Sequence, residues 1–190
     1  MIRHGETTAN CDKTYAGQTD VKLTDLGRQQ ALNIRPILSQ IPVDKVFSSD
    51  LSRAIDTQML AIPEAIGVRT PLLREYDVGS MEGKNFDAPR VLETGEIAKP
   101  GDYKPYGGED YYMVCDRLRS FLKQLEQDPC ENVAAFVHNG IMGCMLRVAL
   151  GMDIDTSAAR SGNCAIHVFD FNGKKWRLQA WNYMNYDPNV

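Results

Sequence analysis

The first ten residues, MIRHGETTAN, place the cation Arg3 directly beside the titratable side chain of His4. A neighbouring positive charge disfavours the imidazolium form, so we expect His4 to be neutral near pH 7. A neutral imidazole is a nucleophile, and a guanidinium binds anions through a planar set of donors. The pair therefore suggests attack on a phosphate. From these two residues alone, the alternative is an Arg-His pair on the surface of a frayed terminus.

Two further basic residues have similar local settings. Arg53 lies just after a short apolar run around Val46 and Phe47, in the first turn of a predicted helix, and helix N-termini favour anions. His138 ends the apolar run VAAFV, which predicts a strand whose carboxyl end delivers a histidine to a turn. That end of a strand is where open α/β sheets bind ligands.

The elements that must position these residues can be read from apolar spacing. The segment 23–38 has apolar residues at near-helical spacing behind Thr24, which predicts a helix with a threonine N-cap. The run at 46–47 predicts a buried strand. A helix capped by Ser49 or Asp50 should follow it and end near Gly67.

The second half alternates in the same way. The Gly-, Pro- and charge-rich segment 74–110 predicts loops with at most one short helix, and Glu109 or Asp110 at its end should begin the next helix. A helix should also follow His138. Alternating residues on both sides of Asn172-Gly173 predict a hairpin. Together these elements indicate an α/β fold, a three-layer α/β/α sandwich with a mostly parallel central sheet.

Composition narrows the function classes. A chain of 190 residues with 43% hydrophobic residues suits one domain spanning 1–190. The net charge is -4 without runs of like charge, which gives no support for binding to nucleic acid or to a membrane surface. Five scattered cysteines indicate reduced thiols, and no apolar stretch approaches the roughly 20 residues of a membrane helix, so we expect a soluble cytoplasmic protein. Monomer and homodimer both stay open.

At this point the sequence resembles the histidine phosphatase superfamily, also called phosphoglycerate mutase-like. The matching pieces run in the family's order from residue 2 to about residue 145: RHGET with Asn10 behind it, LTDLGRQQA, VFSSDLSRAIDT, LREYDVGSMEG, YGGED and VHNG. The resemblance implies that His4 becomes a phosphohistidine and that Arg3, Arg53 and His138 hold the phosphoryl oxygens. It also implies that Glu75 protonates the leaving oxygen.

Physical chemistry supports these roles separately. Phosphoryl transfer needs in-line positioning and positive charge around the equatorial oxygens, which two guanidiniums and an imidazole supply without a metal or another cofactor. No third histidine is at hand for a metal triad, because His167, within a predicted strand, has the setting of a structural residue. A general acid must be protonated, so Glu75 requires burial or a nearby dianionic substrate. The alternatives are a surface ion pair of Glu75 with Arg74, and Glu82 as the acid.

Four more residues are candidate phosphate or substrate contacts. Asn10 could donate from its amide, and Gly17 could let the backbone approach closely, although both also suit ordinary turns. Asn139, in VHNG, replaces the glycine common after the family's histidine and either narrows the pocket or adds a donor. Glu109 either touches the leaving part of the substrate or is a charge favoured at a helix start.

The chain also departs from the family at its beginning. Only Met1 and Ile2 precede Arg3, where family members usually carry several apolar strand residues. Such a strand is too short to be central in a sheet. We therefore expect either that upstream residues are missing from the sequence or that the first strand is truncated.

The function expected is hydrolysis of a small phosphorylated metabolite, a phosphomonoester, through a phosphohistidine. Mutases of the superfamily carry a longer insert between the acid loop and the later helix, and the stretch from Glu75 to Glu109 is short. A more open pocket lets water reach the phosphohistidine. The alternatives are a phosphoglycerate mutase and a catalytically inactive anion-binding module.

Overall fold

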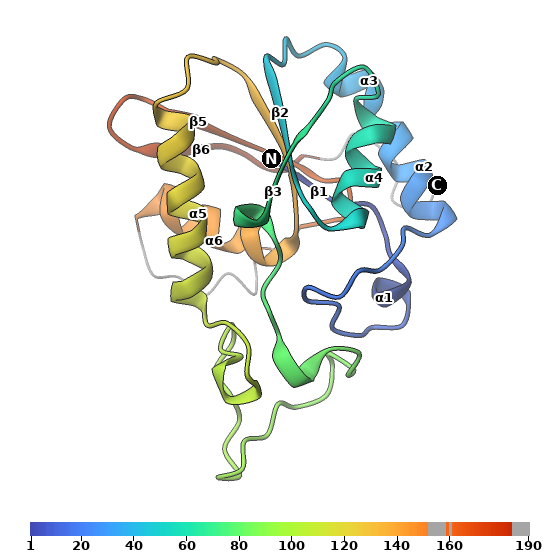
Figure 1. The fold of residues 1–190 in the computed structure, drawn as a ribbon, viewed down its shortest axis with the longest axis vertical. Coiled ribbons are helices and arrows are strands. Elements are labelled where there is room, and N and C mark those ends of the chain that lie inside the picture. Colours follow the sequence, from blue (N-terminus) through green and yellow to red (C-terminus); the bar gives the residue numbers. More distant parts are fainter. Residues whose placement is uncertain (152–158, 160, 184–190) are drawn as a thin grey trace.

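The computed structural model describes residues 1–151, 159 and 161–183. Six strands form one sheet in the order β3-β2-β4-β1-β5-β6 (Figure 1). Neighbours among β1, β2, β3 and β4 pair in parallel, whereas β5 is antiparallel to both of its neighbours. The strands are β1 (Ile2–Arg3), β2 (Lys45–Ser49), β3 (Val68–Thr70), β4 (Val133–Val137), β5 (Ile166–Phe171) and β6 (Trp176–Tyr183). The predicted mostly parallel α/β sheet is confirmed.

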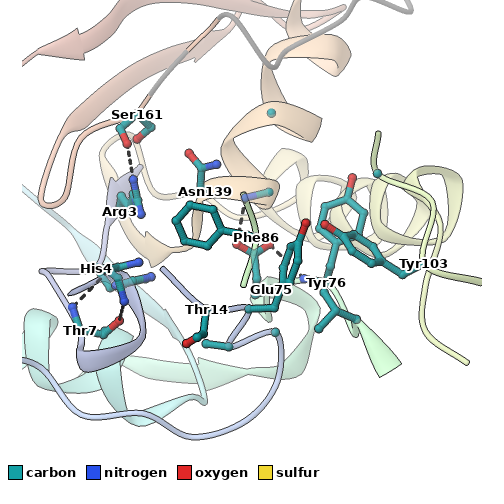
Figure 2. A pocket seen from close by; sticks show the side chains of 18 of the residues that line it. Arg3, His4, Thr7, Thr14, Glu75, Tyr76, Phe86, Tyr103, Asn139 and Ser161 are labelled. Carbon is teal, nitrogen blue, oxygen red and sulfur yellow. Dashed lines mark hydrogen bonds between the residues drawn. The ribbon is translucent and has the colours of Figure 1, made fainter. Parts of the chain in front are cut away.

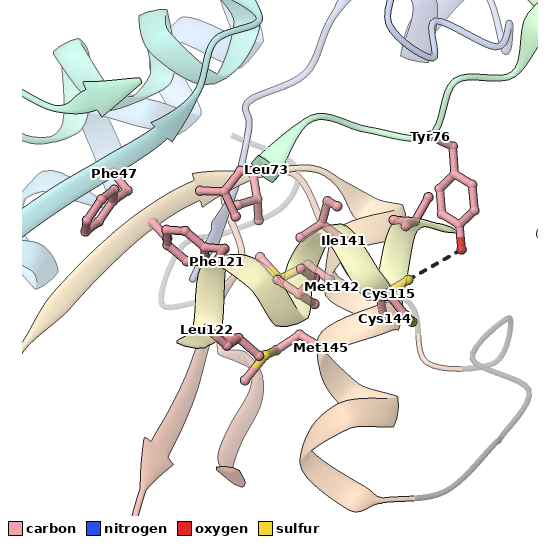
Figure 3. Close-up of a cluster of buried hydrophobic side chains, with 14 of the residues drawn as sticks. Phe47, Leu73, Tyr76, Cys115, Phe121, Leu122, Ile141, Met142, Cys144 and Met145 are labelled. Atoms are coloured by element: carbon pink, nitrogen blue, oxygen red, sulfur yellow. Dashed lines mark hydrogen bonds between the residues drawn. The ribbon is translucent and has the colours of Figure 1, made fainter. Parts of the chain in front are cut away.

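Helices cover both faces of this sheet (Figure 1). Successive side chains of β4 point to opposite faces, so Ala134 and Phe136 pack with the cluster under α2, α3 and α4, while Ala135 and Val137 pack with the cluster under α5 and α6. Figure 3 shows this second cluster, in which the rings of Phe47 and Phe121 meet edge-on. The helices are α1 (Thr8–Cys11), α2 (Asp25–Asn33), α3 (Arg35–Leu38), α4 (Ser52–Ala61), α5 (Tyr111–Glu126) and α6 (Asn139–Leu150).

The single helix predicted over 23–38 is two helices, α2 and α3. The predicted cap is present, because Thr24 accepts a hydrogen bond of 3.0 Å from the Gly27 amide. Pro36 lies in the first turn of α3. A proline has no N–H to continue a helix but is tolerated in a first turn, so the chain restarts there.

The helix predicted after β2 is also shorter than expected. The N-cap residue of α4 is Leu51, and the Ser52 amide in the first turn donates instead to the carboxylate of Asp20 at 2.8 Å, so neither Ser49 nor Asp50 has the predicted capping role. The predicted end near Gly67 is wrong, because α4 stops at Ala61 and Pro63 disfavours helical geometry in the residue before it.

The predicted start of the helix at Asp110 and the predicted hairpin are confirmed. Asp110 caps α5 by accepting from the Met113 amide at 2.9 Å. The segment between β3 and α5 contains the short 3-10 helices η1 (Pro71–Leu73), η2 (Gly79–Met81) and η3 (Lys104–Tyr106). The loop character is as predicted, but the limit of one short helix is wrong, because both η2 and η3 lie in the predicted loop segment. The hairpin of β5 and β6 turns around residues 172–175. Within the described residues, no helix has the length and apolar character needed to cross a membrane.

The first strand is interior to the sheet although it has two residues, which corrects the expectation that so short a strand cannot be central. It lies between β4 and β5. Backbone hydrogen bonds continue beyond its ends, from the His4 amide to Val137 at 3.0 Å and from the His167 amide to Met1 at 2.8 Å. These bonds fix the backbone that carries His4.

Candidate active site

Three of the basic residues meet where parallel strands end. His4 follows β1, His138 follows β4, and Arg53 lies in the first turn of α4 behind β2. The ring centres of His4 and His138 are 5.2 Å apart, and the Arg53 Nε lies 3.2 Å from the His138 Nδ1. All three side chains are buried. The structure thus brings together the residues that the sequence placed at separate strand ends.

The hydrogen bond of His4 selects its reactive nitrogen. Its Nδ1 lies 2.7 Å from the Gly5 carbonyl oxygen, which can only accept, so Nδ1 carries the hydrogen in the neutral ring. Burial, then the positive charges of Arg3 and Arg53, lower the pKa of His4 well below its ordinary value. The ring is therefore neutral near pH 7, and Nε2 carries an unprotonated lone pair.

His138 has the opposite tautomer. Its Nδ1 accepts from the Arg53 guanidinium, so the hydrogen of the neutral ring is on Nε2. Burial and the nearby charge of Arg53 hold the pKa of His138 well below its ordinary value. The buried Nε2 has no hydrogen-bond partner among the described residues. An unpaired buried donor costs about 1–3 kcal/mol, which an anionic oxygen placed against it would recover.

Arg53 is 1% exposed, which is unusual for a charged side chain. Burial lowers the pKa of this guanidinium, but an arginine stays protonated at any physiological pH. Its Nη2 donates to the Gly17 carbonyl at 2.7 Å and its Nη1 to the Thr19 carbonyl at 3.0 Å. Arg53 therefore also holds the loop around Gly17 against the site.

Glycines explain the fixed turn after His4. A Cβ on Gly5 would lie 2.4 Å from the Gly27 carbonyl oxygen, and a Cβ on Gly27 would lie 2.0 Å from that of Glu6. The two backbones therefore approach too closely for any side chain. The Gly5 amide also donates to the Thr57 hydroxyl at 3.0 Å, which ties this turn to α4.

Arg3 and Asn10 line the same cavity as His4. Arg3 donates from Nη1 to the Ser161 carbonyl, as Figure 2 shows. The Asn10 Oδ1 accepts from the Thr7 amide at 3.1 Å and from the Asn163 Nδ2 at 3.2 Å. The atom of Asn10 that would donate to a phosphoryl oxygen is therefore its Nδ2.

Glu75 faces the cavity and is held by backbone donors. Its Oε1 accepts from the Tyr76 amide and its Oε2 from the Gly140 amide, both at 3.0 Å. A Cβ on Gly140 would lie 2.2 Å from the Glu75 carboxylate, so the glycine makes room for this residue. The alternative pairing of Glu75 with Arg74 is absent from the described contacts, since Arg74 binds Asp50 at 2.7 and 2.8 Å.

Glu82, the rival acid, is not among the described residues that line the cavity. Its Oε1 accepts from the Gln18 amide at 2.9 Å and the Thr19 amide at 3.3 Å. It therefore supports the loop at Gly17, which itself lines the cavity. Gly17 has a φ of +46°, and a Cβ there would lie 2.3 Å from Glu82. Both facts require a glycine at this position.

Glu109 also lies outside the described lining, which argues against the suggested contact with the substrate. Its carboxylate forms two hydrogen bonds with Arg117, at 2.9 and 3.0 Å, and accepts from the Asp77 amide. Arg117 in turn donates to the carbonyl oxygens of Leu72, Arg74 and Glu75. The pair anchors the loop that carries Glu75.

The cavity has a volume of about 540 Å³. Asn139 lines it at the start of α6, beside Gly140. Sequence reasoning missed the lining residue Arg147 in α6 and several that lie in loops without periodicity, namely Tyr15, Tyr76, Phe86, Tyr103 and Ser161. No group of three His, Cys, Asp or Glu side chains suited to a metal ion occurs in the described part of the chain.

The comparison with families agrees with this geometry. The sequence model described as histidine phosphatase superfamily (branch 1) matches residues 1–184, and the chain belongs to that family. It is thus a phosphoglycerate mutase-like enzyme of the histidine phosphatase type.

Individual relatives carry different activities in their names. "Probable phosphoglycerate mutase GpmB" of Salmonella paratyphi A is 29% identical and covers 95% of this chain and 88% of its own. A mycobacterial glucosyl-3-phosphoglycerate phosphatase solved with VO3 is 26% identical, with a TM-score of 0.83 and coverage of 97% and 98%. The α-ribazole phosphatase from Shigella flexneri, also 26% identical, gives a TM-score of 0.80 and coverage of 96% and 94%.

Proposed function

We propose that this chain is a phosphatase that hydrolyses a small phosphomonoester through a phosphohistidine at His4. The observation that carries the proposal is the pair of tautomers. His4 presents a lone pair on Nε2, and His138, 5.2 Å away between ring centres, presents a buried N–H donor without a partner among the described residues. A nucleophile beside a buried N–H group that can donate to an anionic oxygen suits attack on phosphorus.

The residues divide the chemistry as follows. The His4 Nε2 forms a bond to phosphorus while the bond from phosphorus to the ester oxygen breaks, and Glu75 gives its proton to that oxygen. Arg3, Arg53 and the His138 Nε2 donate to the phosphoryl oxygens. The His4 Nδ1 keeps its hydrogen bond to Gly5, which orients the ring and stabilises its positive charge once phosphorylated. This set of donors acts without a metal.

Hydrolysis completes the cycle. Water attacks the phosphohistidine, Glu75 now accepts a proton from it, and phosphate and neutral His4 are released. The likeness to two phosphatases solved as structures supports this outcome. The likeness to a protein named as a mutase makes return of the phosphoryl group to a second substrate the alternative.

Release of inorganic phosphate from a panel of phosphomonoesters tests the proposal. Wild type should hydrolyse at least one ester in the presence of a metal chelator, and His4→Ala should lose all but a few per cent of the rate while keeping its fold by circular dichroism. Transfer between phosphoglycerates without net phosphate release would favour the mutase. Activity retained by His4→Ala would reassign the nucleophile, with His138 examined next.

A further inference from the structure

One wall of the cavity is not used by the phosphate chemistry. It is aromatic and lies across the cavity from Arg3 and Ser161 (Figure 2). The ring centre of Tyr15 is 6.1 Å from that of Phe86 and 5.8 Å from that of Tyr103, whose own centre is 5.7 Å from that of Tyr76. Edge-on contacts therefore join four rings, the aromatic wall, into one surface: Phe86, Tyr15, Tyr103 and Tyr76.

Backbone pairing fixes the first two rings of the aromatic wall. The Tyr15 amide donates to the Lys84 carbonyl at 2.9 Å, and the Phe86 amide donates to the Lys13 carbonyl at 2.9 Å. The Gly83 amide bonds back to the Tyr15 carbonyl at 2.8 Å. Two loops distant in sequence thus hold these rings in place before any ligand binds, which reduces the entropy lost on binding.

An arginine fixes the third ring. The Arg90 guanidinium carbon lies 4.7 Å from the ring centre of Tyr103, and the same group donates to the Lys99 carbonyl at 2.6 Å and to the Asp102 carbonyl at 3.0 Å. Arg90 therefore folds the loop that carries Tyr103 back on itself. Tyr76, next to Glu75 in sequence, brings the wall up to the proposed acid.

The solvent exposure of the aromatic wall increases from Tyr76 to Phe86. Tyr76 is buried, whereas Phe86 is 42% exposed. A ring exposed at the mouth of a cavity has apolar area that a ligand can remove from water. The wall is thus shaped to cover a group that extends outward from the phosphate.

The charged residues of the cavity lie in two separate places. Arg3, Arg53 and Glu75 lie at the phosphate end, whereas Arg147 lines the cavity two turns along α6 from Asn139, about 12 Å away by helix rise. The Arg147 guanidinium carbon lies 4.0 Å from the ring centre of Tyr111. The described lining also contains the four rings of the aromatic wall, together with small and apolar residues such as Val78 and Pro100.

We propose that the aromatic wall binds the alcohol part of the phosphomonoester, and that this alcohol carries an aromatic or similarly flat, apolar ring. The proposal rests on the proposed phosphatase function of the same site. Aromatic side chains bind aromatic ligands favourably, because the contact buries apolar area and allows edge-to-face packing. A small anionic alcohol part, such as glycerate, would leave the wall in water or lose its own hydration against it.

Paired substrates test the proposal. 2-Phenylethyl phosphate and ethyl phosphate have alkyl leaving groups of similar acidity and differ in the ring. Wild type should show kcat/KM about 10-fold or more higher for the phenylethyl ester. Phe86→Ala should lower that value about fivefold through KM and change the ethyl ester less than twofold. As a control, Ile66→Ala, at an exposed apolar residue outside the described lining, should change neither.

Binding without turnover separates the two proposals. 2-Phenylethylphosphonate and methylphosphonate contain a C–P bond in place of the ester, and calorimetry should find the first bound about 10-fold more tightly, with the advantage lost in Phe86→Ala. Equal hydrolysis of both esters, or a preference for 3-phosphoglycerate, would overturn the aromatic class while the phosphatase function stands. Tighter binding of the phenyl compound through Phe86 without hydrolysis of any ester would support the wall and overturn the phosphatase.

Discussion

At the scale of single residues, the site depends on which atom of each side chain carries a hydrogen. The carbonyl of Gly5 fixes the His4 tautomer, and Arg53 fixes that of His138. Glu75 is fixed by two amides, one of which belongs to Gly140 at the start of α6. Backbone groups and one buried guanidinium therefore fix the side chains of the proposed nucleophile, phosphate donor and acid.

Glu75→Gln tests the acid role. An acid matters for a poor alkoxide leaving group and little for p-nitrophenolate, which departs unaided. We expect a loss of roughly 10²- to 10⁴-fold in kcat for ethyl phosphate and much less for p-nitrophenyl phosphate. Glu82→Gln is the matched control, because Glu82 supports the loop at 18–19 outside the described lining. Equal losses on both substrates for Glu75→Gln would remove the acid role from this residue.

At the scale of elements, α5 anchors the loop that carries Glu75, the proposed acid. Arg117, in α5, donates to three carbonyl oxygens of residues 72–75 and binds Glu109, which in turn accepts from the backbone of the same loop. Its side chain is 16% exposed. The sheet thus positions the proposed phosphate donors, and a helix anchors the loop that carries the proposed acid of the same cavity.

Arg117→Ala should therefore act through Glu75. We expect kcat for ethyl phosphate to fall about 10- to 100-fold, part of the usual value of a general acid, with a smaller effect on p-nitrophenyl phosphate. In a Glu75→Gln background, Arg117→Ala should lower kcat for ethyl phosphate by less than about a further threefold, because the effects of coupled residues are not additive. Arg119→Ala, on the same helix with an exposed pair to Asp116, is the control and should leave both rates unchanged. If the kcat losses of Arg117→Ala and Glu75→Gln multiplied in the double variant, the anchoring role would be contradicted.

At the scale of the whole molecule, folding buries every histidine of the chain as a neutral ring. Burial, with nearby positive charge, lowers the pKa of His4 and His138 well below the ordinary value and that of His167 to about 3. The unfolded chain binds these protons at about pH 6.5 and the folded chain does not. Stability is then greatest above pH 6.5 and is lost as the pH falls towards the lowered pKa values.

Urea unfolding in buffers without phosphate measures this loss. Each histidine should remove about 1 kcal/mol of the free energy of unfolding between pH 6.5 and 5.5, about 3 kcal/mol in total. The carboxylates titrate at lower pH and contribute little in this window. His167→Gln should reduce the loss by about one third. A free energy of unfolding that does not change from pH 6.5 to 5.5 would show that the rings are protonated in the folded chain.

The sequence carried enough information to predict the convergence of His4, Arg53 and His138, because each follows an apolar run and parallel strands end at one edge of a sheet. The sequence was less informative where tertiary contacts determine the partner of a side chain. The partner of Glu109 depends on how the loop at 72–77 packs on α5. The helix ends at Pro36 and Pro63 were visible locally, but apolar spacing continued past both prolines.

The aromatic wall shows why lining residues are harder to predict than catalytic ones. Phe86 and Tyr103 lie in loops without periodicity, and they reach the cavity through pairing with residues 13–15 and folding around Arg90. Neither arrangement leaves a pattern in the sequence. Chemistry-bearing residues at strand ends have such a pattern, which is why the meeting of His4, Arg53 and His138 could be predicted and the wall could not.

The central claim is covalent attack by the Nε2 of His4. Wild type quenched within milliseconds of mixing with a ³²P-labelled phosphomonoester should carry acid-labile, alkali-stable label, and peptide mapping with ³¹P NMR should place it on Nε2 of His4. His4→Asn should carry no label, and Glu75→Gln should still become labelled by p-nitrophenyl phosphate. Label on His138, label on Nδ1 of His4, or rapid hydrolysis without any labelled protein would contradict the account.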